Sequence, residues 1–574
     1  METFGKACPR FGSTSATVNR VGRLALLACS AALLLAGGAA AALLAPGSDA
    51  AATTSTSTAT TTTTSSAPPP AADVSTAPAV VAFTGHGWGH GLGLAQWGAY
   101  GYALHGLAYD KILAHYYPGT TLGQARVATV RVLVASKQKI TLSSTTPWTI
   151  VDSTGAKTQL DAGQLVFDST FTVDGSRLEP PLKITAKAPV AVSGVAYRGK
   201  LTLTLEGKLV DAIDAVGLEQ YLKGVVPSEM PSKWPADALE AQAVAARSYA
   251  LANLTKGRPY DLYGDARSQV YGGIAAESDS ASAAVDATKG QVVLYNGNVA
   301  NTLFFSTSGG RTVSALEATG VDVPYLVSVA DPYDTLSPYH DWGPVLFDAR
   351  AVAKQLKLSE PIASLSVVIG ASGRVKSFVA SAADDAQVTL TGNQVRNALG
   401  LRSTWFSPAF LQLSPAARTI TYGGALSLRG VARGATGLSL EAKTAGGAWA
   451  DAGPLPVDPD GTFALIVKPQ VTTQYRLAFG DARACLARIA VAARVSAVVT
   501  PQGVQGTLRP LAPGAPIQLQ QKHDDGGWTT LSSATADPTS AWSFTAQLAA
   551  GTYRVRAAPG HGVAAGLSAP FTVQ

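Results

Sequence analysis

Alternation of apolar and polar residues runs through the chain from about residue 125 to residue 210. Short runs at residues 130–134, 148–151 and 201–205 repeat with a period of two and are separated by turns. This pattern predicts β-strands. Residues 235–254 instead have helical spacing and predict the longest helix, with Pro235 at its start. Two shorter helices are expected, over residues 94–105 and 109–117.

The last 165 residues show short β-type runs and an internal repeat. A Gly-Trp pair and a later Tyr-Arg pair occur twice, with Trp449 26 positions before Tyr475 and Trp528 25 positions before Tyr553. This spacing predicts two β-sandwich modules of about 80 residues each. We interpret Trp449 and Trp528 as core residues, with contact to sugar as the alternative.

A chain of 574 residues is too long for a single core. We therefore predict an α+β fold of mixed strands and helices, followed by two β-sandwich (Ig-like) modules. The expected divisions are residues 1–50 (signal peptide or membrane anchor), 51–80 (Thr/Pro-rich linker), 81–408 (α+β domain), 409–495 and 496–574 (β-sandwich modules).

The N-terminus has the pattern of an export signal. A basic stretch ending at Arg23 precedes residues 24–44, which carry no charge, and small residues follow. This order is typical of a secretory signal, and an uncleaved membrane anchor is the alternative. Residues 53–78 are rich in Thr, Ser, Ala and Pro, which predicts an extended linker. We expect a secreted protein of the cell envelope.

Charge and cysteine content exclude some classes of function. The net charge is +6, and no dense Lys/Arg patch occurs, so no nucleic-acid partner is expected. Of the three cysteines only Cys485 lies beyond the targeting segment. The mature chain therefore has neither an internal disulfide nor a cysteine zinc site.

One carboxylate stands out, Glu229 in the run Val-Pro-Ser-Glu-Met-Pro at residues 226–231. Pro231 disfavours a helical conformation for Met230, so we expect Glu229 on a rigid loop ahead of the long helix. Apolar neighbours would raise its pKa, as a general acid requires. The alternative is a capping or salt-bridging glutamate at a helix entrance.

Two long polar side chains, Gln242 and Arg247, lie within the alanine-rich helix that follows. Buried polar groups need partners, so Arg247 either binds a substrate carboxylate or forms a structural ion pair. Both interpretations stay open.

Three further loops are candidate sites, because loops near element ends often carry function. Residues 85–93 alternate glycine with other residues and present two imidazoles and an indole, which suit sugar binding or a structural turn. The chemistry-bearing residues of the three loops are His86, Trp88 and His90, then Gln269 and Tyr271, then Ser306.

Taken in order, these runs resemble the SpoIID/LytB family over residues 85–405. The runs that carry the resemblance are residues 226–231, 241–251, 269–273, 306–312, 331–334 and 391–404.

The resemblance implies a function. The sporulation member of the family is a lytic transglycosylase that cuts peptidoglycan glycan strands, and its catalytic glutamate corresponds to Glu229. The LytB name belongs to an amidase enhancer, so a non-catalytic wall-binding protein is one alternative. A glycoside hydrolase with Asp265 or Asp237 as second carboxylate is the other.

A lytic transglycosylase needs one carboxylate, which serves as acid and then as base. The expected partners are peptidoglycan glycan strands and other cell-wall proteins, and a membrane only through an uncleaved N-terminal segment. The expected substrate-binding residues are Tyr271, Gln242, Arg247, Ser306, His86, Trp88, His90 and Gln269.

Two departures from the family pattern have consequences. Some relatives hold zinc through His and Cys residues in this domain. Here Phe305 and Ser308 stand in the loop where such ligands would be sought, and the domain has no cysteine. We therefore expect no metal and no other cofactor. The Gly-His-Gly run also comes first instead of last. This order suggests a circular permutation in which residues 81–120 pack beside residues 390–405.

Overall fold

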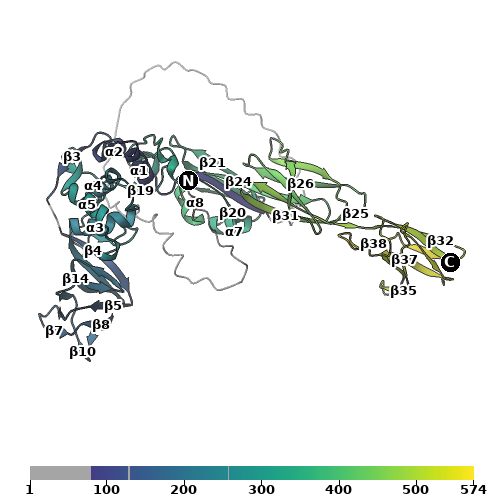
Figure 1. Cartoon of the computed structure of the whole chain (residues 1–574), viewed down its shortest axis with the longest axis horizontal. Helices are drawn as coiled ribbons and strands as arrows, with labels where there is room; N and C mark the ends of the chain where they lie inside the picture. Colours follow the sequence, from purple (N-terminus) through teal and green to yellow (C-terminus); the bar gives the residue numbers. More distant parts are fainter. Residues whose placement is uncertain (1–78, 127–128, 256) are drawn as a thin grey trace, which may run out of the picture.

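The computed structural model describes residues 79–126, 129–255 and 257–574, which form an elongated molecule (Figure 1). A unit rich in helices lies at one end, and two β modules extend from it toward the C-terminus. The predicted targeting segment and the linker up to residue 78 lie outside the described residues. Within the described ranges, no helix is both long and apolar enough to cross a bilayer.

The first unit is built around α4 (Ala236–Ala252), the helix predicted over residues 235–254. Its alanine-rich surface is buried on most sides, because small side chains let neighbouring elements approach closely. The helices α1, α2, α3 and α5 all contact it. The helical elements around α4 are α1 (Gln96–Leu104), α2 (Tyr109–Tyr116), α3 (Leu218–Glu229), the 3-10 turn η1 (Ile274–Ala276), α5 (Asp279–Ala287) and α6 (Ala315–Thr319).

Strands form the rest of the first unit, as the alternating pattern predicts. The largest sheet runs, in spatial order, β16 (Leu262–Tyr263), β4 (Thr129–Lys137), β15 (Leu209–Gly217), β14 (Lys200–Glu206), β11 (Leu182–Ala186), β6 (Trp148–Val151) and β7 (Lys157–Leu160). A second sheet shares its core and runs β13 (Val195–Tyr197), β12 (Val190–Val192), β5 (Lys139–Ser144) and β8 (Gly163–Asp168).

Smaller sheets join distant parts of this unit. They are β18 (Asn298–Val299) with β17 (Gln291–Tyr295) and β3 (Thr121–Gln124), β19 (Phe304–Phe305) with β2 (Leu94–Ala95), and β10 (Ser176–Arg177) with β9 (Thr172–Val173).

A second, smaller core lies between the helical unit and the C-terminal modules. Its largest buried side chains include Phe83, Phe378 and Phe406. The ring of Phe406 meets that of Phe83 edge to face and lies tilted against that of Phe378. The elements that form it besides β1 (Ala79–His86) and β24 (Phe406–Pro415) are β21 (Ile362–Ile369), β22 (Val375–Ala382), β23 (Gln387–Leu390), α7 (Ala349–Leu356) and α8 (Gly392–Leu399), and the turn η2 (Asp334–Leu336) precedes it.

The start of the described chain belongs to the sheet of the first β-sandwich module. That sheet runs β20 (Asp341–Asp348), β1 (Ala79–His86), β24 (Phe406–Pro415), β26 (Leu426–Arg433) and β29 (Thr462–Val467). The opposing sheet runs β25 (Thr419–Thr421), β31 (Ala482–Ala492), β30 (Thr473–Phe479), β27 (Ser439–Thr444) and β28 (Ala450–Pro454). Residue 409, where we expected a domain boundary, therefore lies inside β24.

The last module has a core of its own, which includes Trp542. One sheet runs β32 (Arg494–Thr500), β33 (Gly503–Arg509) and β36 (Ala541–Thr545). The other runs β35 (Trp528–Thr535), β34 (Pro516–Lys522), β37 (Gly551–Ala557) and β38 (Gly566–Leu567), and β39 (Phe571–Val573) also pairs with β37.

The interpretation of Trp449 and Trp528 as core residues is wrong. Both side chains are partly exposed, and each ring is covered by an arginine from the same sheet, on β30 for Trp449 and on β37 for Trp528. The guanidinium carbon of Arg476 lies 3.9 Å from the ring centre of Trp449, and that of Arg554 lies 4.1 Å from that of Trp528. The repeat seen in the sequence is thus a repeated Trp-Arg stack on the module surface.

Candidate functional site

Glu229 is the last residue of α3, so the expectation that it lies on a loop is wrong. Helix α3 continues through Pro227, and the Ser228 hydroxyl donates a hydrogen bond to the carbonyl of Gly224 over 2.8 Å. The helix ends where Met230 takes an extended conformation (φ −125°, ψ 145°). Pro231 is the physical reason, because a proline disfavours the helical conformation of the residue before it.

The Glu229 side chain is partly buried, and burial is the main reason why its pKa is raised. The backbone N–H of Val270 donates to Oε1 of Glu229 over 2.9 Å, which lowers the pKa in part. The position at the C-terminal end of a helix disfavours a negative charge as well. The carboxyl group is thus suited to hold a proton and still keeps contact with solvent.

Gln96 is the first residue of α1, and its side chain faces the Glu229 carboxyl. Its contact with that carboxyl also lowers the pKa of Glu229. The Gln96 side chain is buried, and its Nε2 makes no well-aligned hydrogen bond to any described residue. Tyr221 and Tyr249 complete the surroundings, since the charge of Glu229 helps to raise the pKa of each phenol after the larger effect of burial.

No second carboxylate is among the groups that shift the pKa of Glu229. The two acids expected as alternatives have other partners. The Asp265 carboxylate pairs with Arg267 at 2.8 Å, which holds its pKa below the usual range although burial alone would raise it. The Asp237 carboxylate accepts the backbone N–H of Tyr109 over 3.1 Å.

Arg247 is fully buried and forms a structural ion pair. Its guanidinium donates to both carboxylate oxygens of Glu219, at 3.0 and 2.7 Å, and to the carbonyls of Val285 and Gln291. These bonds tie α3 and α5 to α4. Of the two interpretations left open by the sequence, the structure supports the ion pair, and the arginine is not positioned to meet a substrate.

Three other expected substrate-binding residues are buried as well. Tyr271 donates its hydroxyl hydrogen to Oδ2 of Asp214 over 3.2 Å, and Gln269 joins the hydroxyl of Tyr221 to the carbonyl of Ala246. Gln242 is buried with no hydrogen-bond partner for its amide in the described chain. Their burial revises the expected role of all three from glycan contact to support of the elements around Glu229.

The glycine-rich loop at residues 85–93 is set between three other segments. Gly87, Gly89, Gly91 and Gly93 all have positive φ, which explains why glycines alternate there. Without side chains they lie against residues 303–308 and Arg374.

All three of the loop's expected sugar-binding residues are partly exposed, and two of them, His86 and Trp88, contact residues 339–341. Nδ1 of His86 lies 2.6 Å from Oδ1 of Asp341. The ring of Trp88 meets that of Tyr339 edge-on, with centroids 4.5 Å apart. Their contacts run to residues 339–341, and it is the following helix α1 that reaches Glu229.

His90 is held as a neutral imidazole. Its Nδ1 accepts the N–H of Leu92 over 3.1 Å, so Nε2 carries the hydrogen that is donated to the carbonyl of Phe304 over 3.0 Å. Burial lowers its pKa to about 4, and the charges of Arg396 and Arg374 act in the same direction. His90 therefore supports the loop and carries no charge near neutral pH.

Ser306 links the loops to α1, because its carbonyl accepts the backbone N–H of Trp97 over 3.0 Å.

Strand β1 pairs with β24 from Ala79 to Gly85, and the Ser403 hydroxyl donates to the carbonyl of His86. The front segment therefore packs beside residues 403–412 and also reaches Glu229 through Gln96. The circular permutation itself remains a hypothesis about the order of the segments.

Sequence reasoning did not single out Gln96, which faces the Glu229 carboxyl, or the aromatic residues Trp97, Tyr100 and Trp234. Each stands within or next to a run that we quoted for other reasons. The approach of Gln96 to Glu229 depends on how α1 packs in the fold, which no local pattern encodes.

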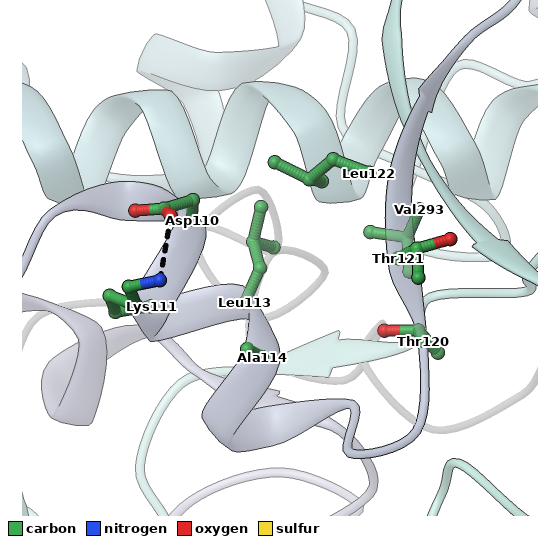
Figure 2. Close-up of a pocket in the computed structure, with 8 residues that line it drawn as sticks. All are labelled: Asp110, Lys111, Leu113, Ala114, Thr120, Thr121, Leu122 and Val293. Atoms are coloured by element: carbon green, nitrogen blue, oxygen red, sulfur yellow. Dashed lines mark ion pairs between the residues drawn. The ribbon is translucent and has the colours of Figure 1, made fainter.

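A separate shallow pocket of about 280 Å³ lies between α2 and strands β3 and β17, away from Glu229 (Figure 2). Asp110 and Lys111 form an ion pair at its edge, and aliphatic side chains line the rest together with Thr120 and Thr121. None of the expected site residues lines it.

Comparison with known proteins identifies the domain that carries Glu229. The family model SpoIID (Stage II sporulation protein) matches residues 206–295, which span α3, α4 and the loop of Gln269 and Tyr271. The chain carries a SpoIID-family domain. Glu229, its helix and the donor Val270 all fall inside the matched residues, whereas Gln96 lies outside them.

Three curated proteins are similar to the chain over part of its length. An uncharacterized protein of Brachyspira hyodysenteriae is 39% identical over 141 residues (24% of this chain, 38% of that protein). The amidase enhancer of Bacillus subtilis is 30% identical over 205 residues (35% and 28%). The stage II sporulation protein D of the same organism is 30% identical over 212 residues (34% and 61%). The chain thus spans between 28% and 61% of these relatives.

Proposed function

We propose that this chain is an exported peptidoglycan lytic transglycosylase in which Glu229 serves as general acid and then as general base. The observation that carries the proposal is the Glu229 carboxyl inside a SpoIID-family domain, partly buried, with a raised pKa and one oxygen bonded to the N–H of Val270. A carboxyl whose pKa is raised and that remains reachable from solvent is suited to act as a general acid.

The reaction needs no second acid and no water. Glu229 gives its proton to the oxygen that bridges MurNAc to GlcNAc, and the bond from the MurNAc C1 to that oxygen breaks. The Glu229 carboxylate then takes the proton of the C6 hydroxyl of the same MurNAc, whose oxygen bonds to C1. A 1,6-anhydro sugar forms, and Glu229 is protonated again as at the start.

Glycoside hydrolysis is the less favoured reaction, because it usually requires a second carboxylate near the first. Asp265 and Asp237 have the partners described above, and neither shifts the pKa of Glu229. Product analysis distinguishes the two reactions. We expect purified protein to release glycan fragments whose ends lack one water, on peptide-free or intact peptidoglycan, and fully hydrated ends would contradict the proposal.

The matched control is Glu229→Gln, which keeps the shape of the side chain but cannot donate the acid proton. We expect its rate to fall by about 10² to 10⁴-fold. Anhydro products formed at an unchanged rate would exclude Glu229 as the acid.

A non-catalytic enhancer is the second candidate function, and the similarity to the amidase enhancer favours it. In that case Glu229→Gln would leave the stimulation of a wall amidase intact, and neither form would release anhydro ends. Measuring amidase stimulation and glycan cleavage with the same two proteins separates the two functions.

Export to the cell envelope is part of the proposal. We expect the protein to be recovered from the wall or the medium, and N-terminal sequencing shows whether the segment ending near residue 52 has been removed. Recovery from the cytoplasm alone would contradict export.

A further inference from the structure

Three aromatic side chains meet between α1 and the turn that follows α3. Trp97 and Tyr100 come from α1, and Trp234 comes from the turn between α3 and α4. The rings of Tyr100 and Trp234 stack with their centroids 4.6 Å apart, and Trp97 meets them edge-on at 5.6 and 5.0 Å. We call these three residues the aromatic platform.

The hydrophobic core explains only part of the aromatic platform. Trp234 packs against the core of the first unit, whereas Trp97 and Tyr100 lie outside that cluster. All three side chains are partly exposed. Single exposed apolar residues are common, but a contiguous group of large rings is typical of a binding site.

The aromatic platform is attached on two sides to the residues around Glu229. Trp97 directly follows Gln96, which faces the carboxyl. Trp234 follows Glu229 by five residues, in a turn where its N–H donates to the carbonyl of Pro231 over 3.0 Å. Both segments are anchored, since the Trp97 N–H donates to the carbonyl of Ser306 and Ser232 bonds to Ser278 and Ser280.

We infer that Trp97, Tyr100 and Trp234 form a sugar-stacking subsite that holds a glycan strand beside Glu229. A pyranose ring has a face of C–H groups and a rim of hydroxyls. Indole and phenol rings match this ligand, because they offer an apolar face with one polar edge. The inference rests on the proposed function, since it assigns the glycan to the same site.

The rival explanation is that the three rings only pack α1 against the turn after α3. A binding experiment in the Glu229→Gln protein distinguishes the two explanations, because that protein holds substrate without consuming it. The probe is a soluble, peptide-free oligosaccharide of alternating GlcNAc and MurNAc, titrated by calorimetry so that the loss of a tryptophan does not affect the readout.

We expect Trp97→Ala to weaken binding about tenfold, which corresponds to the loss of one stacking contact. Trp97→Phe keeps an apolar ring, so its affinity should fall between that of the parent and that of Trp97→Ala. Tyr295→Ala is the matched control, because Tyr295 is also partly exposed and in contact with another aromatic ring, that of Tyr325, but lies on β17. It should bind the oligosaccharide as the parent does.

Thermal unfolding of every variant separates binding from packing. Affinity within about twofold of the parent for both Trp97→Ala and Tyr100→Ala would overturn the inference, and so would a loss of affinity that follows the loss of Tm across the variants. In the Glu229-containing protein, Trp97→Ala should raise KM for glycan strands with little change in kcat.

The outcome for the aromatic platform and the outcome for the proposed function can be told apart. If Glu229→Gln cleaves glycan normally, the proposed catalysis fails, and the KM of Trp97→Ala in the Glu229-containing protein still tests the subsite. If Glu229→Gln is inactive and both Trp97→Ala and Tyr100→Ala bind normally, only the subsite fails.

Discussion

The pKa of Glu229 is raised mainly by burial and not by a charged neighbour. Burial is the first cause of its raised pKa, and no other carboxylate contributes. A general acid must be protonated in the free enzyme, so kcat/KM should be level at low pH and fall as the pH rises through the pKa of Glu229. Initial rates on soluble glycan from about pH 4 to about pH 9 test this. A decline on the acid side alone would exclude the acid role.

The same burial predicts an effect on stability. The folded-state pKa of Glu229 is raised, so its contribution to stability is fully present below the unfolded pKa and is lost as the pH rises through the folded pKa. Glu229→Gln removes this titration. Its free energy of unfolding, measured with urea, should therefore exceed that of the parent at high pH and approach it at low pH. A difference that does not change with pH would contradict the assignment.

Gln96 also affects the pKa of Glu229, in the opposite direction to burial. Because it lowers the pKa of Glu229, replacing it with an apolar side chain of similar length should raise that pKa. For Gln96→Met we expect the alkaline fall in kcat/KM to move to higher pH. Gln394→Met, in the capping box of α8, is the control and should leave the profile in place. A lower rate with an unshifted profile would mean that Gln96 only supports packing.

At the residue scale, the sequence predicted the raised pKa of Glu229 but not which residues surround it. The prolines around Glu229 mark an unusual glutamate, and apolar neighbours predict its raised pKa. Gln96 and Trp234 have no comparable local pattern, since they reach the site only through tertiary packing.

At the scale of elements, periodicity predicted α4 closely, because its alanine-rich spacing and Pro235 define both its face and its start. The end of helix α3 was missed because the effect of Pro231 on Met230 was taken to place Glu229 on a loop, although the helix runs through Pro227 to Glu229. A proline in the last turn costs one hydrogen bond, and the surrounding packing tolerates this. The long polar residues of α4 were found, but the sequence could not tell that Arg247 points to Glu219.

The Arg247–Glu219 pair makes a testable structural prediction. Removing one partner of a buried pair leaves an uncompensated charge, so Arg247→Met should destabilise the protein by about 3 kcal/mol. The double variant Arg247→Met with Glu219→Gln should recover much of the loss. Urea unfolding measures both. If the single variant unfolds like the parent yet loses glycan binding, Arg247 acts on the substrate instead.

At the scale of the whole molecule, the first described residues belong to cores and sheets that are otherwise built from residues much later in the sequence. Helices α1 and α2 belong to the core of the first unit, while β1 lies between β20 and β24 and contributes to the next two cores. A linear division of the sequence at residue 409 could not reveal this, because strand order is a property of the sheet. The site and the first module are therefore joined through β1.

Two truncations test this continuity. Ending the chain after Ala493 removes only the last module, whose core is its own. We expect that protein to be soluble and to cleave soluble glycan as the full chain does. Ending it after residue 408 removes most of β24 and all of β26 and β29, which exposes the edge of β1 and uncovers Ala82. An unpaired edge of this kind favours aggregation.

The chain ending at residue 408 should therefore show a lower Tm and concentration-dependent light scattering. Any loss of its activity would then reflect lost folding and not lost wall binding.

The chain ending at Ala493 is also mixed with insoluble cell wall and pelleted. If it pellets less than the full chain but cleaves soluble glycan equally well, wall attachment belongs to the last module. If the chain ending at residue 408 stays monomeric with the Tm of the chain ending at Ala493, the shared sheet does not stabilise the site, and the first module folds apart from it.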